Sequence, residues 1–295
     1  MENQTSQHKS GYVAIIGLPN AGKSTLLNAF LEQKLSIITP KAQTTRHRIT
    51  GIHSDDESQI IFLDTPGIIN PKYKLQEAMM AAVDNAGRDA DVIIHLVDPK
   101  EDDHSVEITK ALKELKKTKI LVVNKTDLIP DSVVKSTIQG WASEIKYLHT
   151  VGISALQGRG VKELMTLIKN LMPEGPAYYP KDQLSDHPER FFISEIIREK
   201  LFLQFRQEIP YSCTVNIVEY TETDTKDQID AEIIVSRDSQ KGMIIGKHGA
   251  AIKKLGIDSR RDIENFLGKK VNLKLFVKVR DNWREKDLFV KNYGY

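Results

Sequence analysis

Residues 17–24, Gly-Leu-Pro-Asn-Ala-Gly-Lys-Ser, constrain the fold of this chain more than any other feature. They follow an apolar run at residues 12–16 and open an amphipathic stretch at residues 23–31, so they join a predicted strand to a predicted helix. The spacing fits G-x-x-x-x-G-K-[ST], in which glycines let backbone amides turn inward around phosphate oxygens. A simple glycine turn is the alternative, but the flanking strand and helix favour a phosphate-binding loop.

Short apolar runs alternate with amphipathic stretches through the first 172 residues. The runs predict strands at residues 12–16, 60–63, 92–97, 120–123 and 151–153, and the stretches predict helices at residues 23–31, 75–88, 106–115, 134–145 and 161–171. This alternation predicts an α/β fold, a mostly parallel sheet with helices on both faces. In such folds ligands bind at the carboxyl ends of the strands.

The pattern breaks at residues 172–187, where three prolines and then a polar stretch are typical of a segment between domains. We therefore predict a first domain at residues 1–175, a linker at residues 176–189, and a smaller α+β domain with a C-terminal tail at residues 190–295. The elements expected in this second domain are a helix at 190–207, strands at 214–220 and 230–235, a helix at 250–266 and a strand at 271–279.

Charge is spread unevenly along the chain. The formal net charge is +2, but residues 237–295 carry 15 basic and 7 acidic side chains, a local excess of +8. A basic end behind a neutral body is the electrostatic footprint of a polyanion-binding module, although composition alone fits a solvated helical surface equally well. Cys213 is the single cysteine, so we expect no internal disulfide and a small core residue. No run of 18 apolar residues exists, and we expect a cytoplasmic protein.

Two short motifs at strand ends indicate which base the site takes. Asn124, Lys125 and Asp127 follow the predicted strand at residues 120–123, and Ser154 and Ala155 follow the next one. A carboxylate at Asp127 can accept the ring N–H and the exocyclic amine of guanine, a donor pair that adenine lacks. Asn124 and Lys125 would brace the base pocket, and Ser154-Ala155 can offer a backbone amide to the guanine carbonyl. The motifs therefore predict guanine specificity, against an ATPase alternative.

A Mg²⁺ site is expected beside the phosphate loop. Ser24 supplies a hydroxyl to the metal, and Lys23 is placed to reach the β- and γ-phosphates. Asp64, at the end of a predicted strand, would hold the metal through water, while Gly67 offers its amide to the γ-phosphate. A threonine at position 44 or 45 would complete the metal shell only with GTP, which makes a switch. We favour Thr45, and expect a second mobile segment at residues 68–75.

These motifs resemble the signature elements of the translation-factor-related GTPases. In many relatives a glutamine follows the Asp64–Gly67 motif and orients the attacking water, but this chain has Ile68, as in the hydrophobic-substituted GTPases. In relatives with an asparagine at the position of Asn20, its carbonyl helps coordinate K⁺, which can neutralise transition-state charge. The resemblance therefore implies slow, K⁺-stimulated GTP hydrolysis. The alternative is that Asn20 only shapes the turn.

The expected roles group the residues as follows. Catalysis is assigned to Asn20, Lys23, Thr45 and Gly67. Phosphate binding is assigned to Gly17, Leu18, Pro19, Asn20, Ala21, Gly22, Lys23, Ser24 and Thr25. Arg46, His47 and Arg48 are expected to be exposed switch residues, and His95 is expected to be a hydrogen-bonded core histidine.

A second motif lies in the basic end of the chain. Gly246-Lys247-His248-Gly249 fits the G-X-X-G loop of a KH domain, in which two glycines allow a nucleic-acid strand to approach the backbone. An apolar segment precedes it, with Ile245 at its end, and a predicted helix follows it. The order of elements suits the second KH topology, and a glycine turn in a basic domain is the alternative. The expected RNA-binding residues are Ile245, Gly246, Lys247, His248, Gly249, Lys253 and Lys254.

A GTPase domain followed by a KH domain resembles the Era family of ribosome-assembly GTPases over nearly the whole chain. The likeness includes the switch segment at residues 40–48 and residues 275–280 with Trp283, which could stack on a base or pack in the core. The resemblance implies binding of small-subunit ribosomal RNA near its 3′ end, a role in maturation of that subunit, and peripheral association with the inner membrane. The alternative is a GTP-dependent scaffold whose C-terminal domain binds protein or membrane. A monomer is the default expectation.

Overall fold

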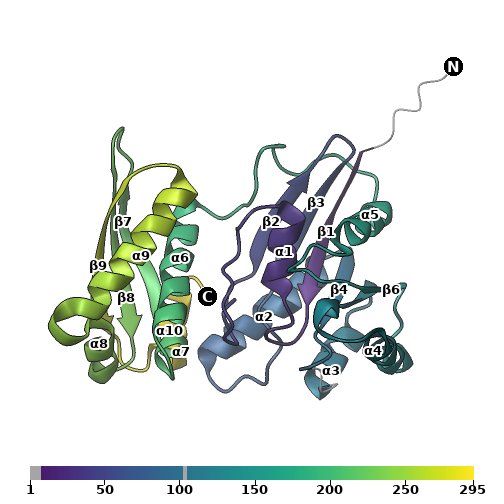
Figure 1. Cartoon of the computed structure of the whole chain (residues 1–295), viewed down its shortest axis with the longest axis horizontal. Helices are drawn as coiled ribbons and strands as arrows, with labels where there is room; N and C mark the ends of the chain where they lie inside the picture. The colour runs from purple at the N-terminus through teal and green to yellow at the C-terminus, as the bar shows by residue number, and fades with distance from the viewer. Residues whose placement is uncertain (1–7, 102–104) are drawn as a thin grey trace. The chain divides into compact units, whose positions relative to one another are not determined.

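The computed structural model describes residues 8–101 and 105–295, so the first seven residues of the predicted domain 1–175 lie outside the described part (Figure 1). The chain forms two compact units. Asp186 ends the first unit, and His187 begins the main segment of the second. Each unit has its own sheet and its own apolar core.

The sheet of the first unit has the strand order β2-β3-β1-β4-β5-β6. Its strands are β1 (Lys9–Ile16), β2 (Ile49–Ser54), β3 (Ser58–Asp64), β4 (Val92–Val97), β5 (Thr118–Val123) and β6 (His149–Gly152). Neighbouring strands are parallel, except that β2 is antiparallel to β3. The carboxyl ends of β1, β3, β4, β5 and β6 therefore meet at one edge, where the loops that follow them converge.

Helices cover both faces of this sheet, as expected from the alternating pattern (Figure 1). They are α1 (Lys23–Leu31), α2 (Lys74–Asp89), α3 (Val106–Glu114), α4 (Asp131–Glu144) and α5 (Val161–Leu171), and a short turn of helix, η1 (Thr126–Leu128), follows β5. On one face α1 packs beside α5, and Phe30 stacks on Phe62 of β3 with ring centroids 4.4 Å apart. On the other face Ala86, Leu112 and Trp141 of α2, α3 and α4 share one buried core with the sheet.

Residues 176–186, which we call the strap, are hydrogen-bonded to the first unit. Their main anchor is Gln59 of β3, whose side chain is fully buried. Its Nε2 donates to the carbonyl of Tyr179 (2.9 Å), and its Oε1 accepts the amides of Tyr178 (2.7 Å) and Tyr179 (2.9 Å). Backbone groups of the predicted linker at residues 176–189 are thus bonded to the sheet of the first unit.

The end of the strap also bonds to β2, the strand that follows the switch segment. The amide of Ile52 donates to the carbonyl of Leu184 (2.8 Å), and the hydroxyl of Ser185 donates to the carbonyl of Thr50 (2.6 Å). These bonds satisfy backbone groups on the outer edge of β2, which would otherwise be open to pairing with another chain.

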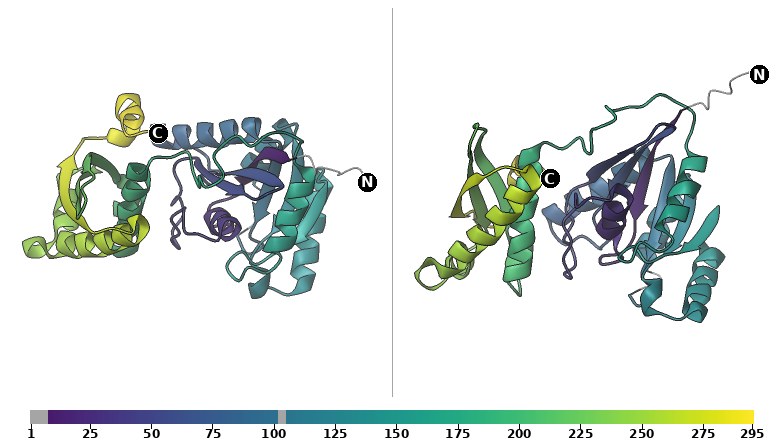
Figure 2. Two further views of the ribbon diagram at one scale, coloured as in Figure 1. Left: turned by 90° about the horizontal axis from the view of Figure 1, so that it is seen from above. Right: turned by 45° about the horizontal axis from the view of Figure 1, so that its top comes forward.

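The second unit is a three-stranded sheet, in the order β7-β8-β9, with helices packed on one face. Its strands are β7 (Thr214–Thr221), β8 (Asp227–Val235) and β9 (Val271–Val279), and its helical segments are α6 (Glu189–Gln204), α7 (Ile209–Ser212), α8 (Asp238–Ile245), η2 (Lys247–Gly249), α9 (Ala250–Leu267), η3 (Trp283–Glu285) and α10 (Asp287–Asn292). α6 and α9 contact each other, and Figure 2 shows them along the same sheet. Ile197, Leu255 and Ile263 form its core with Ile229 and Ile233 of β8.

The sequence analysis missed the strand β2 and the short helices α7, α8 and α10. The β2 segment Ile-Thr-Gly-Ile-His-Ser has no continuous apolar run, and it is a strand because it pairs with β3. A Cβ at Gly51 would lie 2.6 Å from a methyl of Leu27, so the glycine lets α1 approach the strand closely. The helix α8 was missed because it is one short segment interrupted by Gly242, a poor helix former.

Candidate functional site

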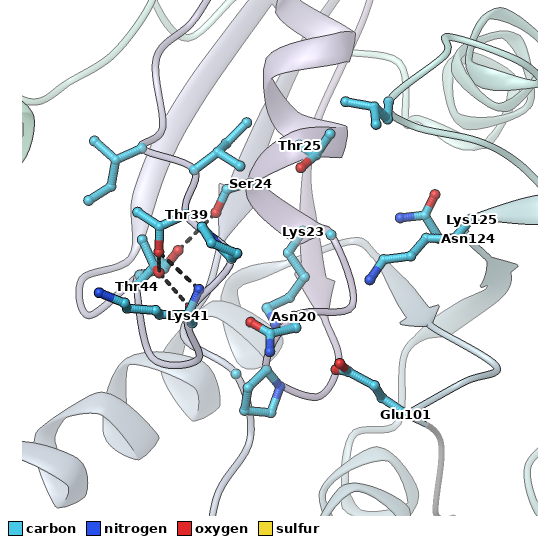
Figure 3. Close-up of a pocket in the computed structure, with 18 of the residues that line it drawn as sticks. Asn20, Lys23, Ser24, Thr25, Thr39, Lys41, Thr44, Glu101, Asn124 and Lys125 are labelled. Carbon is cyan, nitrogen blue, oxygen red and sulfur yellow. Dashed lines mark hydrogen bonds between the residues drawn. The ribbon is translucent and has the colours of Figure 1, made fainter. Parts of the chain in front are cut away.

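A cavity of about 510 Å³ lies where the strand-end loops of the first unit converge (Figure 3). Predicted site residues that line it are Pro19, Asn20, Gly22, Lys23, Ser24, Thr25, Thr45, Gly67, Asn124, Lys125, Asp127 and Ser154. The predicted residues Gly17, Leu18, Ala21, Asp64 and Ala155 are not part of this lining. Lining residues missed by the sequence analysis include Thr39, Lys41, Glu101, Leu128 and Leu156. The cavity is within the size range of small-molecule sites, about 300–1,000 Å³.

The phosphate-loop segment needs its glycines for two different reasons. Gly22 has φ +98°, in the left-handed region, and a Cβ there would lie 2.3 Å from Nδ2 of Asn124. A Cβ at Gly17 would lie 2.2 Å from the carbonyl oxygen of Leu96 on the neighbouring strand. Asn20 is also left-handed, with φ 63°. The loop can therefore fold tightly only with small residues at 17 and 22, as the motif predicts.

Lys23 points back into this loop from the first turn of α1. Its ammonium donates to the carbonyls of Gly17 (3.1 Å) and Leu18 (2.7 Å). Burial lowers the pKa of Lys23 to about 8, while the nearby Asp64 carboxylate acts in the opposite direction. A cation held in a buried, amide-lined loop is the arrangement that phosphate oxygens require.

Ser24, Thr45 and Asp64 form one hydrogen-bonded cluster although they come from three separate segments. The Ser24 hydroxyl donates to Oδ2 of Asp64 (2.6 Å) and lies 2.8 Å from the Thr45 hydroxyl. Burial raises the pKa of Asp64 to about 6, and the Ser24 hydrogen bond and the Lys23 charge oppose that rise. Oδ1 of Asp64 is buried and has no hydrogen-bond partner in the described part of the chain. Hydroxyl and carboxylate oxygens with a spare buried acceptor fit a hard cation such as Mg²⁺.

Thr44 lies in a different environment from Thr45. Its hydroxyl donates to the carbonyl of Lys41 (2.7 Å) and lies 2.6 Å from the hydroxyl of Thr39, as Figure 3 shows. These bonds keep Thr44 within its own loop, whereas Thr45 contacts Ser24. The geometry therefore offers Thr45, and not Thr44, as a partner of the Ser24–Asp64 pair.

Asn124 connects the phosphate loop with the second base motif. Its Nδ2 donates to the carbonyl of Ala21 (2.9 Å), and its Oδ1 accepts the amide of Ala155 (3.0 Å). Lys125 forms an ion pair with Asp98 at 2.6 Å, so its stem lies along one side of the cavity. Leu156, which is 83% exposed, supplies an apolar side chain at the rim. No polar motif marks a leucine of this kind, so sequence reasoning could not single it out.

Gly67 and Ile68 place no polar side chain beside the phosphate loop. A Cβ at Gly67 would lie 2.5 Å from the backbone nitrogen of Pro19, so this position admits only glycine. Ile68 is 5% exposed and packs into the core of the first unit, and its amide donates to the carbonyl of Gly17 (3.1 Å). Its side chain is apolar and offers neither a donor nor an acceptor.

Expectations for three basic switch residues were wrong, and that for His95 is confirmed. Arg46 is 3% exposed, and His47 and Arg48 are half-buried, not exposed. Arg48 is held by an ion pair with Asp89 at 2.6 Å, which sequence patterning does not reveal. His95 is fully buried, and its Nδ1 bonds the hydroxyl of Tyr147 at 2.7 Å.

The second candidate site is the loop between α8 and α9. Gly246 (φ 70°), His248 (φ 52°) and Gly249 (φ 75°) have positive φ angles, which turn the chain sharply into α9. Lys247 and His248 are exposed at the tip, and Lys253 and Lys254 are exposed on the first turns of α9. Ile245 is half-buried at the end of α8. The loop therefore presents cations and open backbone at one end of the helix pair.

Two other residues of the second unit lie in its interior. Trp283 is fully buried, and its Nε1 donates to the carbonyl of Ser212 (2.9 Å), so it packs in the core and is not placed for base stacking. Cys213 is fully buried, as predicted.

The two units match two known families. Residues 12–125 match the family described as 50S ribosome-binding GTPase, and residues 208–284 match the KH domain. Fold and site together define a P-loop GTPase joined to a KH domain.

Relatives that match over nearly the whole chain identify the family within this class of GTPases. GTPase Era of Lacticaseibacillus paracasei is 44% identical over 98% of both chains, and the chloroplastic GTPase ERA-like protein of Oryza sativa is 48% identical over 98% of this chain and 70% of its own. A crystal structure of Era with MgGDPNP and nucleotides 1506–1542 of 16S ribosomal RNA superposes with a TM-score of 0.94 at 41% identity, covering 98% of this chain and 99% of that one. The chain belongs to the Era family of GTPases. None of the helices in residues 8–101 and 105–295 has the length and apolar character needed to cross a membrane.

Proposed function

We propose that this GTPase is a nucleotide-controlled switch that binds small-subunit ribosomal RNA near its 3′ end and acts in maturation of that subunit. The observation that carries the proposal is that one chain combines a cavity lined by phosphate-loop and base-motif residues with an exposed, lysine-bearing G-X-X-G loop. The solved Era complex with MgGDPNP and 16S ribosomal RNA supports both ligands by similarity.

GTP binding rests on residues that the fold brings to one edge. Lys23 and the loop amides would hold the β- and γ-phosphates, and Asp127 would accept the guanine N–H and amine. Ser24 and Thr45 would ligate Mg²⁺ directly and Asp64 through water, and the metal neutralises charge on the phosphates. Thr45 belongs to the switch segment and lies beside Ser24, so a shared Mg²⁺ ion would tie the order of that segment to the nucleotide.

We also propose that a K⁺ ion stabilises the transition state of hydrolysis, because Ile68 offers no polar side chain for that purpose. Asn20 lines the cavity in a left-handed conformation that asparagine tolerates, with its side chain beside the phosphate loop (Figure 3). Asn20→Gly keeps the backbone conformation available but removes the carbonyl ligand, whereas Asn20→Asp keeps an oxygen. Turnover of the unaltered protein should be higher in KCl than in NaCl, and Asn20→Gly should abolish that difference. Equal turnover in the two salts would contradict the K⁺ proposal without touching guanine specificity.

The RNA interface can be tested with charge reversals at exposed positions. The double variant Lys247→Glu, Lys254→Glu should lose affinity for a 3′-end RNA and show a shallower salt dependence, because each lost phosphate contact lowers the slope by about one. Lys116, an exposed lysine of the first unit, supplies the matched control Lys116→Glu. Basal GTP hydrolysis should stay unchanged in both. Loss of nucleotide binding in the double variant would contradict the separation of the two sites.

The alternative function is a GTP-dependent scaffold whose C-terminal domain binds protein or membrane. The same basic loop could attract anionic lipid, so flotation with vesicles of phosphatidylglycerol is the discriminating measurement. RNA binding with no recovery on vesicles supports the RNA proposal for this loop. If the protein binds no RNA but binds vesicles, and Lys247→Glu abolishes the vesicle binding, the membrane-binding scaffold replaces the RNA proposal.

A further inference from the structure

Ser36 contacts the Asp64 carboxylate from a segment that none of the motifs includes. Its side chain is 1% exposed, and its hydroxyl lies 3.1 Å from Oδ2 of Asp64. A carboxylate only accepts, so the hydroxyl is the donor. The same Oδ2 accepts the Ser24 hydroxyl at 2.6 Å, while Oδ1 has no partner in the described part of the chain. Both donors therefore hold one oxygen and leave the other available.

Asn28 fixes the backbone that carries Ser36. Its Oδ1 accepts the amides of Leu35 (3.0 Å) and Ser36 (2.8 Å), and its Nδ2 donates to the carbonyl of Ser36 (2.8 Å). Asn28 lies four residues after Ser24 on α1, so the two side chains project from the same face of that helix. One face of α1 thus carries both Ser24, which donates directly to Asp64, and Asn28, which fixes the backbone of the second donor, Ser36.

We propose that Ser36 is a positioning residue for Asp64, one that orients the carboxylate toward the Mg²⁺ of the nucleotide. The inference rests on the proposed role of Asp64 as a water-mediated Mg²⁺ ligand. Hydrogen-bonding partners of ligating groups set the direction in which those groups present their lone pairs. Without Ser36 the carboxylate keeps only the Ser24 bond and can rotate about its terminal torsion, which has a broad profile.

The test is Ser36→Ala, which removes the hydroxyl and leaves the Asn28 backbone clamp intact. The full chain is loaded with a fluorescent GDP analogue, and its dissociation is followed over a series of free Mg²⁺ concentrations. The Mg²⁺ concentration for half-maximal retention should rise about tenfold, at the low end of the ~10–100-fold seen when such partners are removed. In excess EDTA the dissociation rate should equal that of the unaltered protein, because the phosphate loop is unchanged.

Two further variants separate positioning from packing. Ser36→Thr keeps the hydroxyl and should keep the Mg²⁺ midpoint of the unaltered protein. Ser58→Ala is the matched control, because Ser58 is 2% exposed and its hydroxyl donates to a carboxylate, Asp55, at 3.1 Å, away from the nucleotide cavity. It should leave the Mg²⁺ midpoint unchanged.

The outcomes are distinguishable. An unchanged midpoint in Ser36→Ala, or dissociation that is faster than in the unaltered protein by the same factor in EDTA and in Mg²⁺, would overturn the positioning role and leave Ser36 a loop anchor. If GDP retention by the unaltered protein does not depend on Mg²⁺, the proposed Mg²⁺ site itself fails. Those two failures appear in different samples, the variant in the first case and the unaltered chain in the second.

Discussion

Gln59 is the main anchor of the strap and is fully buried, so Gln59→Leu should destabilise the first unit strongly. Leucine has a similar size but can neither donate nor accept, and it keeps water out of the site. The substitution leaves the Tyr178 amide and both backbone groups of Tyr179 without the partners that Gln59 provides. The fourth bond, to the half-buried hydroxyl of Ser54, can be replaced by water.

The magnitude follows from those three backbone groups. An unsatisfied buried donor or acceptor costs about 1–3 kcal/mol, which for three groups gives an upper range of roughly 3–9 kcal/mol. The strap can instead detach and hydrate them, which limits the cost to the free energy of docking the strap. We therefore expect a loss near the bottom of that range, about 3 kcal/mol in the free energy of unfolding.

The assay uses the two tryptophans, which lie one in each unit. Trp141 is fully buried in the first unit and Trp283 in the second. In a Trp283→Phe background, Trp141 fluorescence reports unfolding of the first unit alone. With a typical urea slope of about 1–3 kcal/mol per molar, a loss of about 3 kcal/mol lowers the urea midpoint by at least about 1 M.

A matched control is Gln183→Ala, which removes one hydrogen bond from a half-buried glutamine in the same strap. It should cost no more than about 1 kcal/mol. Trypsin should also cleave after Lys181 faster in Gln59→Leu than in the control, because detachment exposes the strap backbone. A midpoint shift no larger in Gln59→Leu than in Gln183→Ala would refute the role assigned to Gln59.

Two further predictions concern the switch threonines and acid stability. Thr45→Ala should weaken Mg²⁺-dependent binding of a GTP analogue about tenfold more than Thr44→Ala, as measured by titration calorimetry, and equal losses would remove the distinction between the two residues. Burial raises the pKa of Asp55, but the bond from Lys169 and the amides of Glu57 and Ser58 outweigh it and hold that pKa below its ordinary value of 3.8. The folded state stabilises the Asp55 carboxylate, so the free energy of unfolding should fall as the pH drops below about 4. In Asp55→Asn the urea midpoint should change less between pH 5 and pH 3 than in the unaltered protein. An equal change of the midpoint in the two proteins would contradict the role of Asp55.

Patterns of residue type predicted the parts of the molecule that are local in sequence. The alternation of apolar runs and amphipathic stretches gave the parallel sheet, because buried strands and helices differ in length and period. The phosphate loop was predictable because its glycines and lysine must be adjacent in the chain. The KH domain followed from a four-residue loop and the order of elements around it.

Contacts between distant segments could not be predicted in the same way. Ser36 reaches Asp64 across 28 residues, and Gln59 reaches Tyr179 across 120. A polar residue that becomes buried through such a contact looks like any other loop or strand residue in the sequence. The burial of Arg46 was missed for a related reason, because charged residues between motifs are ordinarily exposed.

The most direct test of the central claim is the affinity for RNA in each nucleotide state. The dissociation constant for an RNA of the small-subunit 3′ end is measured by fluorescence anisotropy at fixed salt, with Mg²⁺ and either GDP or a non-hydrolysable GTP analogue. A nucleotide-controlled RNA-binding switch predicts tighter binding with the analogue, by about fivefold or more, and loss of RNA binding in Lys247→Glu, Lys254→Glu. Equal affinity in the two nucleotide states, or RNA binding that survives the charge reversal, would contradict it.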